Sequence, residues 1–251
     1  MISIIIPVYN NLEMTKECIN AVRECTTDYE IIVVDNGSEP AFIKPYTGFV
    51  DLLIIRNETN KGFPVAINQG IKVAKGDVIV LLNNDVVVTP MALNRLAEWL
   101  LDDFAIVGPL TNYCAGKQKV SIPVYNTKEE LYERGNEVAE ENNNEAVEVN
   151  WLIGFCMAFK KSLYEEIGEF DESLWPCSGE EIDFCYKAKA KGHSIGIALD
   201  TYVHHFGSQT FHELVKTGQV NYNDVCVRND KHLAKKWGAS FWTNQEVVYA
   251  S

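Results

Sequence analysis

The sequence lacks the segments that mark membrane and secreted proteins. No apolar run reaches the roughly 18 to 20 residues of a membrane-spanning helix, and the short apolar stretch after Met1 has no basic segment ahead of it. We therefore expect neither a transmembrane segment nor a signal peptide. The seven cysteines are scattered without a C-x-x-C pair, which indicates neither zinc nor dithiol chemistry. We expect a cytoplasmic protein, and a peripheral position at a membrane is compatible with this expectation.

Positive charge is also scarce. The chain has 22 Lys and Arg residues against 35 Asp and Glu residues, and its formal net charge is −13. Because binding to a nucleic-acid backbone requires neutralisation of phosphates by Lys and Arg, this balance disfavours it. No basic cluster stands out in the sequence, so we expect no strong nucleic-acid surface.

Three common motifs are absent as well. No G-x-G-x-x-G follows a strand-like segment, and the chain contains neither a G-x-S-x-G elbow nor a Walker lysine loop. These absences argue against dinucleotide-dependent hydride transfer, α/β-hydrolase chemistry and P-loop nucleotide hydrolysis.

The features that are present point to an α/β protein. Hydrophobic residues make up 47% of the 251-residue chain, enough for a sizeable core. β-Branched apolar runs predict strands, and apolar residues at i, i+3 and i+4 predict helices between them. The predicted strands are 2–6, 29–34, 52–55 and 78–82, and the predicted helices are 12–25 and 63–75. Because these strands are apolar throughout, both faces of the sheet should be covered, which is typical of a mainly parallel sheet flanked by helices.

The rest of the chain continues this pattern. Thr89 should cap a helix that has Pro90 at its first position and ends near Leu101. Strands are predicted at 105–107, 151–159, 195–198 and 202–206, and helices at 160–167 and 180–191. The acidic segment 128–148 is expected to be a solvated helix and a mobile loop. We expect one domain over residues 1–220, with a helix and tail over 221–251 packing on it through Trp237 and Trp242.

Polar clusters follow three of the predicted strands, at Pro7–Asn10, Asp35–Ser38 and Asn83–Asp85. In open parallel sheets, ligands bind at the carboxyl ends of the strands, so these clusters should share one ligand-binding edge. Asp85, at the end of a buried strand, would be held ionised by a divalent cation; alternatively, it belongs to a turn capped by its own side chains. Asp35 could accept a hydrogen bond from a nucleobase imide, or could stabilise a β-turn.

A third acidic group lies in the sequence Ser178-Gly179-Glu180-Glu181-Ile182-Asp183. Ser178 and Glu181 match a capping box, which would explain one of the carboxylates. Three acids exceed what a cap needs, so a general base and an acceptor-binding carboxylate are both possible here. Helical spacing predicts that Glu180 and Asp183 share a face and that Glu181 points elsewhere.

The adjacent His204 and His205 lie at the end of a predicted strand and should point to opposite faces. One of them could join Asp85 in holding Mn²⁺ or Mg²⁺, since a carboxylate and an imidazole suit these ions. The alternative for each is an ordinary core or surface histidine.

Together these segments resemble the family 2 glycosyltransferases, inverting enzymes of the GT-A fold (the fold of nucleotide-diphospho-sugar transferases), and in particular their rhamnosyltransferase-like branch. The matching segments lie in order between Ser3 and about Thr210: SIIIPVYNN, EIIVVDNGS, RNETNKGFPVAINQGIKVAKGD, VIVLLNNDVVV, WLIGFCMAFKKSLYEEIGEFDE, GEEIDFCYKAKAKG and VHHFGSQT. The resemblance implies a single GT-A domain with a mainly parallel central sheet flanked by helices.

The resemblance also implies roles for individual residues. The nucleotide site would contain Pro7, Tyr9, Asn10, Asp35, Asn60, Gly62, Asn68 and Asn84. Asp85 would bind the metal, as the acid of a D-x-D-like motif in which Asn83 replaces the first Asp, and His205 would complete the site. The catalytic residues would come from Glu181, Glu180 and Asp183. Glu181 stands where the family more usually has the basic Asp, and Glu180 is the alternative base.

The implied activity is metal-assisted transfer of a sugar, with inversion, from a UDP- or dTDP-sugar to a hydroxyl of a glycan, a lipid-linked sugar or another acceptor. A carboxylate would take the proton of the acceptor hydroxyl, while Mn²⁺ or Mg²⁺ would neutralise the leaving diphosphate. Two alternatives stay open. A nucleotidyltransferase-like enzyme should have a basic Gly-rich loop after its first strand, where this chain has PVYNN; an inactive nucleotide-sugar-binding protein would be compatible with the reduced N-N-D motif.

Overall fold

The computed structural model describes residues 1–42, 52–101, 103–207, 214–216, 218 and 220–238. Its strands are β1 (Ile2–Val8), β2 (Tyr29–Asn36), β3 (Leu53–Asn57), β4 (Val78–Leu82), β5 (Val86–Val88), β6 (Ile106–Thr111), β7 (Ala146–Val149), β8 (Cys156–Lys160) and β9 (Ile195–His205). Its helices are α1 (Leu12–Cys25), α3 (Phe63–Val73), α4 (Ala92–Trp99), α5 (Lys128–Glu141), α6 (Lys161–Ile167), α7 (Glu180–Ala190) and α9 (Tyr222–Trp237).

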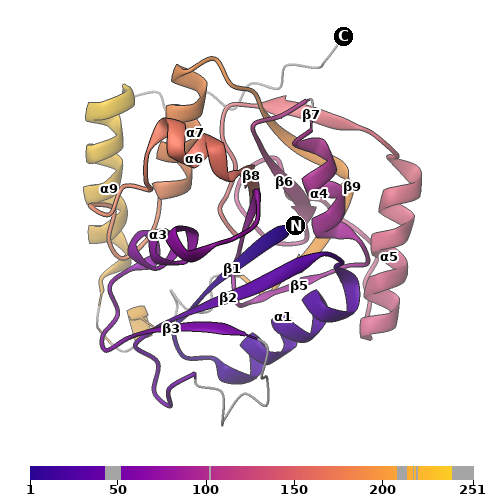
Figure 1. Cartoon of the computed structure of the whole chain (residues 1–251), viewed down its shortest axis with the longest axis horizontal. Helices are drawn as coiled ribbons and strands as arrows, with labels where there is room; N and C mark the ends of the chain where they lie inside the picture. The colour runs from indigo at the N-terminus through magenta and orange to yellow at the C-terminus, as the bar shows by residue number, and fades with distance from the viewer. Residues whose placement is uncertain (43–51, 102, 208–213, 217, 219, 239–251) are drawn as a thin grey trace.

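The strands form one sheet in the order β3-β2-β1-β4-β8-β6-β9-β5, and β7 pairs with β9 outside this path (Figure 1). The half of the sheet formed by β3, β2, β1 and β4 is parallel throughout. Beyond it β8 runs antiparallel to both β4 and β6, and β9 runs parallel to β6. The carboxyl ends of β1, β2 and β4 therefore meet at one edge of the sheet, as the sequence predicts.

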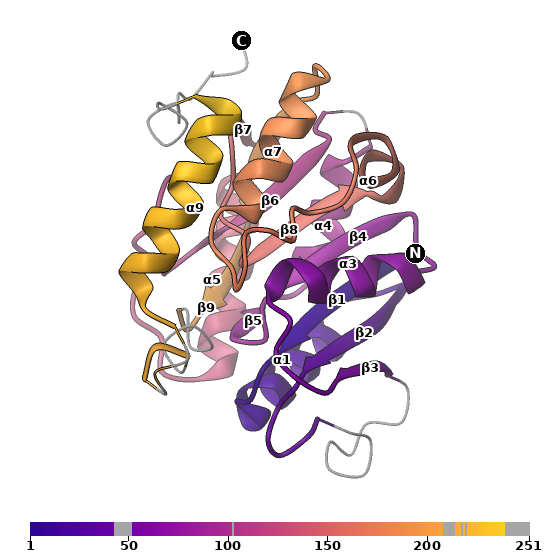
Figure 2. The same cartoon turned by 90° about the vertical axis from the view of Figure 1, so that its left-hand side faces the viewer.

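Helices cover both faces of this sheet. Figures 1 and 2 show α1 and α3 on opposite sides of β1 and β2. On the other half of the sheet, α4 contacts β6, β8 and β9, α5 contacts β9, and α6 contacts β8. Ile4, Ile5 and Ile6 of β1 are consequently all fully buried, which explains why this strand is apolar throughout. The predicted fold class is confirmed.

The helix after Thr89 starts later than predicted, because Met91 occupies the N-cap position and α4 begins at Ala92. Thr89 is fully buried, and its hydroxyl donates to the carbonyl of Tyr202 in β9 (2.6 Å). The hydroxyl thus ties this segment to the sheet instead of capping the helix.

Three segments differ from the predicted strands and loops. The strand predicted at 151–159 begins only at Cys156, and residues 151–155 form a loop. The two strands predicted between 195 and 206 are one long strand, β9, along which the register with β6 shifts once, between Pro109 and Leu110. The acidic segment contains α5, as expected, and then β7, which the sequence did not indicate because the segment alternates apolar residues only briefly.

At the C-terminal end, α9 packs beside α7, where the rings of Tyr186 and Trp237 stack with their centroids 5.5 Å apart (Figure 2). The packing predicted for Trp237 is therefore confirmed, whereas Trp242 lies outside the described residues. The domain boundary at residue 220 stays a prediction. Within the described parts of the chain, no helix combines the length and the apolar character needed to cross a bilayer.

The packing of α3 on the sheet gives a test of the fold. An added Cβ at Gly70 would lie 2.5 Å from Cγ2 of Ile5 and 3.4 Å from Cγ2 of Val34. Alanine would improve the helix propensity by about 0.5–1 kcal/mol, but overpacking a buried site costs about 1–3 kcal/mol. We predict that Gly70→Ala lowers the free energy of unfolding in urea by about 1–2 kcal/mol. Val73→Ala, on the exposed side of the same helix, should change it by no more than about 0.5 kcal/mol, and equal stability of Gly70→Ala and wild type would contradict the packing described.

Candidate active site

A cleft of about 570 Å³ lies at the carboxyl edge of the sheet. It is bordered by the ends of β1 and β2, the turn between β4 and β5, the end of β9, the loop before β8 and the start of α7. Its lining residues are Pro7, Val8, Tyr9, Asn36, Asn60, Phe63, Asn83, Asn84, Asp85, Tyr113, Cys114, Ala115, Ile153, Gly154, Phe155, Pro176, Cys177, Ser178, Glu180, Glu181, His205 and Leu214. Segments from most of the chain thus contribute to one site.

Most of the residues to which the family resemblance assigns a role line this cleft, namely Pro7, Tyr9, Asn60, Asn84, Asp85, Glu180, Glu181 and His205. Five do not belong to its lining: Asn10, Asp35, Gly62, Asn68 and Asp183. The contacts of these five explain their positions.

Asp35 and Asn10 organise the loop that follows β2. The Asp35 carboxylate is fully buried and accepts hydrogen bonds from the backbone N–H groups of Ser38 and Phe42, both at 2.9 Å, and it pairs with Arg56. The N–H of Asn10 donates to Oγ of Ser38 (2.8 Å). The turn-forming role considered for Asp35 is therefore observed, and its contact with a nucleobase stays a prediction.

Asn36, the next residue, lines the cleft, as expected for its polar cluster, but the sequence predicted no individual role for it. Its amide nitrogen donates to Oδ1 of Asn60 (2.9 Å) and to the carbonyl of Gly62 (3.1 Å), while its Oδ1 accepts from the N–H of Lys61 (3.0 Å). This side chain fixes the 60–62 loop against the end of β2. The Asp-Asn-Gly sequence gave no such signal because it is also typical of an ordinary turn.

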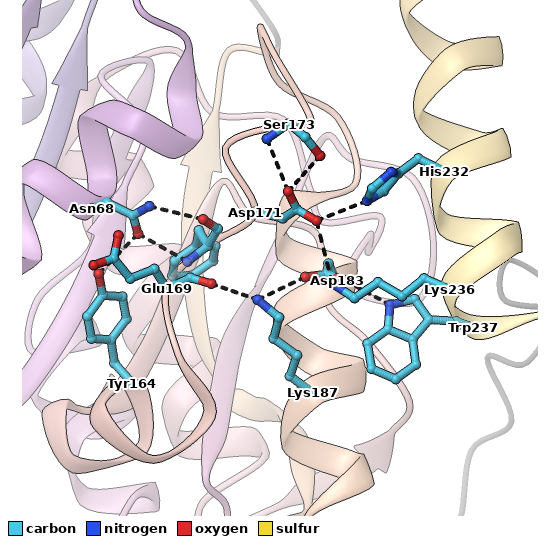
Figure 3. A network of polar contacts seen from close by, with 11 residues as sticks. Asn68, Tyr164, Glu169, Asp171, Ser173, Asp183, Lys187, His232, Lys236 and Trp237 are labelled. Carbon is cyan, nitrogen blue, oxygen red and sulfur yellow. Dashed lines mark hydrogen bonds and ion pairs between the residues drawn. The ribbon is translucent and has the colours of Figure 1, made fainter.

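Asn68 is buried away from the cleft, where it joins α3 to the segment after α6 (Figure 3). Its amide nitrogen donates to the carbonyl of Phe170 (3.0 Å), and its Oδ1 accepts from the N–H of Phe170 (3.1 Å) and the hydroxyl of Tyr164 (3.2 Å). Gly62 is the N-cap of α3 at φ 91°, and a Cβ there would lie 2.6 Å from Cδ1 of Trp175. Gly62 thus lets the start of α3 approach the segment that contains Pro176, a lining residue, whereas these partners of Asn68 do not belong to the lining.

Asp85 and His205 face each other inside the cleft. Asp85 ends the turn between β4 and β5, in which the N–H of Val86 donates to the carbonyl of Asn83 (3.2 Å). His205 is brought beside it because Val86 pairs with His205 across β5 and β9. Nε2 of His205 lies 3.2 Å from Oδ1 of Asp85, and both side chains are buried.

The second nitrogen of His205 fixes the orientation of the ring. Nδ1 lies 2.8 Å from the carbonyl oxygen of Tyr113. Because a carbonyl only accepts, Nδ1 carries a hydrogen, and Nε2 is the ring nitrogen that faces Asp85. The ring also stacks on Phe155, with centroids 5.1 Å apart. An imidazole nitrogen held in place beside a carboxylate is a donor pair that suits a divalent cation.

His204 points to the other side of β9, as the strand geometry predicts. Its Nδ1 contacts the hydroxyl of Tyr125, and its ring lies edge-on to Phe206. Burial lowers the pKa of His204, and the neighbouring His205 lowers it further. His204 is thus held in a side-chain cluster outside the cleft.

Glu180 and Glu181 are consecutive buried carboxylates at the start of α7. They follow Ser178 and Gly179, both at positive φ (88° and 96°), so Gly179 is the N-cap and the predicted Ser178 capping box does not form. One part of the box remains, because Oε2 of Glu181 accepts from the N–H of Gly179 (3.1 Å). Oε2 of Glu180 has no hydrogen-bond partner among the residues that the structure describes.

The surroundings of these two carboxyl groups affect their pKa values to different extents. Burial raises the pKa of Glu181, while backbone groups of Gly179, Gly154 and Ile182 act in the opposite direction. Burial raises the pKa of Glu180 well above its usual range, and the charge of Glu181 raises it further, while backbone groups of Glu180 and Ser178 act in the opposite direction. Proton sharing therefore favours an ionised Glu181 beside a neutral Glu180.

Asp183 does not line the cleft, and its carboxylate lies beside Lys236 and Trp237 of α9 (Figure 3). Its fully buried carboxylate accepts from Nε1 of Trp237 (2.8 Å) and pairs with Nζ of Lys187 (3.1 Å) and of Lys236 (2.7 Å). The orientation predicted from helical spacing, in which Glu180 and Asp183 share a face, is thus wrong. It failed because side chains of α9 hold the Asp183 carboxylate where α7 packs against α9.

Several apolar lining residues gave no functional signal in the sequence. Ile153, Gly154 and Phe155 belong to the segment that was predicted to be a strand. A Cβ at Gly154 would lie 3.1 Å from Cβ of Glu181, so glycine lets Glu181 approach this loop closely. Cys177 lines the same wall, and burial raises the pKa of its thiol well above the usual range. It is therefore a neutral wall residue.

Part of the chain matches a known protein family. The model of the family described as "Glycosyl transferase family 2" matches residues 3–168 of the 251-residue chain. This match includes Asp85 and ends before Glu180, Glu181 and His205.

Among curated proteins, the chain is similar to glycosyltransferase AglE of Haloferax volcanii, with 27% identity over 86% of this chain and 69% of that protein. It is also similar to the undecaprenyl-phosphate 4-deoxy-4-formamido-L-arabinose transferase of Pseudomonas fluorescens, with 33% identity over 43% of this chain and 34% of that protein. The chain thus spans about two thirds of the first relative and about one third of the second.

Among solved structures, GalNAc-T7 with UDP, GalNAc and Mn²⁺ matches 82% of this chain and 43% of its own, with a TM-score of 0.63 and 18% identity. S. aureus TarS in complex with UDP-GlcNAc matches 81% of this chain and 57% of its own, with a TM-score of 0.56 and 19% identity. At such identities the likeness shows the fold, and it confirms the expected GT-A architecture.

The buried Glu180 carboxyl predicts a pH-dependent stability. Its pKa in the folded protein is raised above the unfolded value of about 4.3, so wild type loses stability as the pH rises from there toward the folded pKa, because ionisation is costly in the fold. Glu180→Gln cannot ionise, so we predict that its free energy of unfolding exceeds that of wild type by an amount that grows from pH 5 to pH 8. The exposed Glu133→Gln on α5 should show no such growth, and a constant difference for Glu180→Gln would contradict a raised pKa.

Proposed function

The chain belongs to glycosyl transferase family 2, and from this premise we propose that it transfers a sugar from a nucleoside-diphosphate sugar to an acceptor hydroxyl, with inversion of the anomeric carbon. The observation that carries the proposal is that one cleft contains both a carboxylate–imidazole pair, Asp85 and His205, and a pair of buried carboxylates, Glu180 and Glu181. The first pair suits a leaving diphosphate with its cation, and the second suits proton removal from a hydroxyl.

Glu181 is the proposed general base. Its carboxylate takes the proton of the acceptor hydroxyl while the hydroxyl oxygen forms a bond to the anomeric carbon, and the bond from that carbon to the diphosphate oxygen breaks. The nucleoside diphosphate leaves with the bonding electrons. The N–H of Gly179 donates to Oε2 of Glu181 and supports its charged form. Oε2 of Glu180 has no hydrogen-bond partner among the described residues, and burial together with the charge of Glu181 raises the pKa of Glu180 well above its usual range. This favours Glu181 as the base and Glu180 as a neutral neighbour.

Asp85 and His205 are the proposed ligands of Mn²⁺ or Mg²⁺. The described residues contain no group of three or more His, Cys, Asp and Glu side chains that could hold a metal, so oxygen atoms of the donor diphosphate and water must supply the other ligands. A cation bound there would neutralise negative charge on the diphosphate. The Mn²⁺ named in the GalNAc-T7 structure is compatible with this choice.

The remaining lining residues suggest where the donor lies. Pro7, Tyr9, Asn36 and Asn60 border the end of the cleft formed by β1 and β2, and we assign the nucleoside to them. A UDP-sugar is the first choice, supported by the UDP and UDP-GlcNAc named in the neighbouring structures, and a dTDP-sugar is the second. Asp35 stays a predicted contact of the nucleobase.

The acceptor is proposed only as a hydroxyl of a glycan, a lipid-linked sugar or a related polymer. The names of similar proteins differ in this respect: one acts on undecaprenyl phosphate, and another, from Bacillus spizizenii, is a poly(ribitol-phosphate) β-glucosyltransferase.

The seven cysteines are all free thiols, which is compatible with the expected cytoplasmic location, and that location stays a prediction.

Incubation with UDP-, dTDP- and GDP-sugars tests the reaction. Wild type should release nucleoside diphosphate from one of them, and release of pyrophosphate would instead indicate a nucleotidyltransferase. With that donor, we predict that Glu181→Gln loses about 100-fold or more in turnover while the donor affinity changes by less than about twofold, because the amide keeps the shape of the side chain but cannot take a proton. Glu133→Gln on exposed α5 is the matched control, and a wild-type rate for Glu181→Gln would rule out Glu181 as the base.

Replacement of Asp85 tests the proposed cation site. We predict that Asp85→Asn weakens UDP binding in the presence of Mn²⁺ by about tenfold or more, because the amide is neutral and a poorer ligand, and that binding measured in EDTA changes much less. Isothermal titration calorimetry measures both affinities. Asp77→Asn, an exposed site at the opposite end of β4, provides the control, and equal Mn²⁺ dependence in Asp85→Asn and wild type would exclude Asp85 as a ligand.

A further inference from the structure

Helix α9 reaches the segment that carries the two catalytic carboxylates. Asn229, Leu233 and Trp237 recur at four-residue intervals and therefore share one face of this helix. All three contact residues between Leu174 and Tyr186. Figure 2 shows α9 running alongside α7, and Figure 3 shows Trp237 and Lys236 at Asp183.

Asn229 is the most buried polar side chain of this face, with 1% of its surface exposed. Its amide nitrogen lies within hydrogen-bond distance of three carbonyl oxygens, those of Leu174 (3.3 Å), Cys177 (3.0 Å) and Ser178 (2.9 Å). Its own Oδ1 accepts from Nε and Nη2 of Arg228, at 3.1 and 3.0 Å. The same Arg228 also donates to the carbonyl of Trp175.

All five carbonyl groups of residues 174–178 are thus engaged. Asn229 and Arg228 bind four of them, and the fifth, that of Pro176, accepts from the N–H of Phe63 at the start of α3 (2.6 Å). This segment belongs to no helix or strand, so its backbone conformation depends on side chains and backbone groups from elsewhere. Most of that support comes from two neighbouring residues of α9.

The supported segment leads directly into the catalytic carboxylates. Ser178 and Gly179 both adopt positive φ, and a Cβ at Gly179 would lie 2.6 Å from Cδ1 of Leu233. Glu180 and Glu181 follow at once, and the N–H of Gly179 donates to Oε2 of Glu181. A shift of residues 174–178 would therefore move the first turn of α7 relative to the cleft.

We propose that Asn229 is a positioning residue, which holds residues 174–178 so that Glu180 and Glu181 face the cleft in a fixed geometry. The inference rests on the proposed function for its catalytic consequence. It extends the active unit to α9, which lies outside the region matched by the family model, residues 3–168. It also explains why a polar side chain is buried where α9 packs against residues 174–178, because three carbonyl groups of this segment would otherwise lose a donor.

The variant Asn229→Asp tests this role with little change in volume. It replaces the amide donor by an oxygen that faces three carbonyl oxygens, so the 174–178 segment should be displaced. Asn223→Asp makes the same change at an exposed position of α9 and is the matched control. Asn229→Gln keeps the amide N–H on a longer side chain and should restore part of what Asn229→Asp loses.

Hydrogen exchange followed by mass spectrometry is the first readout, because it does not depend on the reaction. In Asn229→Asp, peptides covering residues 174–183 should exchange at least about tenfold faster than in wild type, while peptides from β1 and β4 keep their protection. Unchanged exchange at 174–183 would overturn the proposal. Faster exchange throughout the sheet would overturn it as well, because it would show a general structural role.

Kinetics are the second readout. With the donor that wild type uses, Asn229→Asp should lose about 10- to 100-fold in turnover, with a less than twofold change in the donor dissociation constant and a shift of the acid limb of the pH–rate profile. If the pH–rate profile is unshifted and a smaller fraction of folded protein explains the loss of turnover, Asn229 does not act as a positioning residue. If wild type releases no nucleoside diphosphate from any donor, the proposed function fails, while the exchange measurement still decides whether Asn229 holds the start of α7.

Discussion

The burial of two consecutive carboxylates, Glu180 and Glu181, is the constraint on which the rest of the site depends. Two adjacent acids removed from water cannot both be ionised cheaply, so their surroundings must decide which one carries the charge. Backbone donors at the start of α7 oppose the rise in pKa of both carboxyl groups, but the charge of Glu181 raises the pKa of Glu180 further, so the negative charge is favoured on Glu181. Backbone geometry that exposes these donors, with Ser178 and Gly179 at positive φ, is consequently part of the chemistry.

Another part of the cleft contains a second pair of buried polar groups, Asp85 and His205. Asp85 and His205 place a carboxylate oxygen and an imidazole nitrogen 3.2 Å apart in a buried position, and the carbonyl of Tyr113 orients the ring. A cation and a diphosphate together would satisfy that wall, while an acceptor hydroxyl would meet Glu181. The proposed reaction thus needs only groups that the fold brings to one cleft. The net charge of −13 agrees with this arrangement, because the proposed cation, and not a basic surface, would supply the positive charge.

The sequence predicted the parallel half of the sheet well, because β1, β2 and β4 are continuous apolar runs that only a doubly covered sheet accommodates. It also predicted that Asp85 lies at the carboxyl edge, since this follows from strand order alone. The sequence did not predict the contacts that depend on strand register or on helix packing. The pairing of Val86 with His205 brings the histidine to Asp85, and no local pattern encodes that pairing. Asp183 was misplaced because its face of α7 is decided by α9, which is distant in sequence.

The most direct test of the account is a ¹³C NMR titration of the side-chain carboxyl groups in glutamate-labelled protein, with Glu180→Gln and Glu181→Gln used for assignment. The account predicts that the pair titrates in two separate steps above the pH range of the exposed glutamates, that Glu181 ionises first, and that Glu180 retains its proton longest. If Glu180 ionised before Glu181, or if both ionised together with the exposed glutamates, the claim that this buried pair provides a charged base beside a neutral partner would be contradicted.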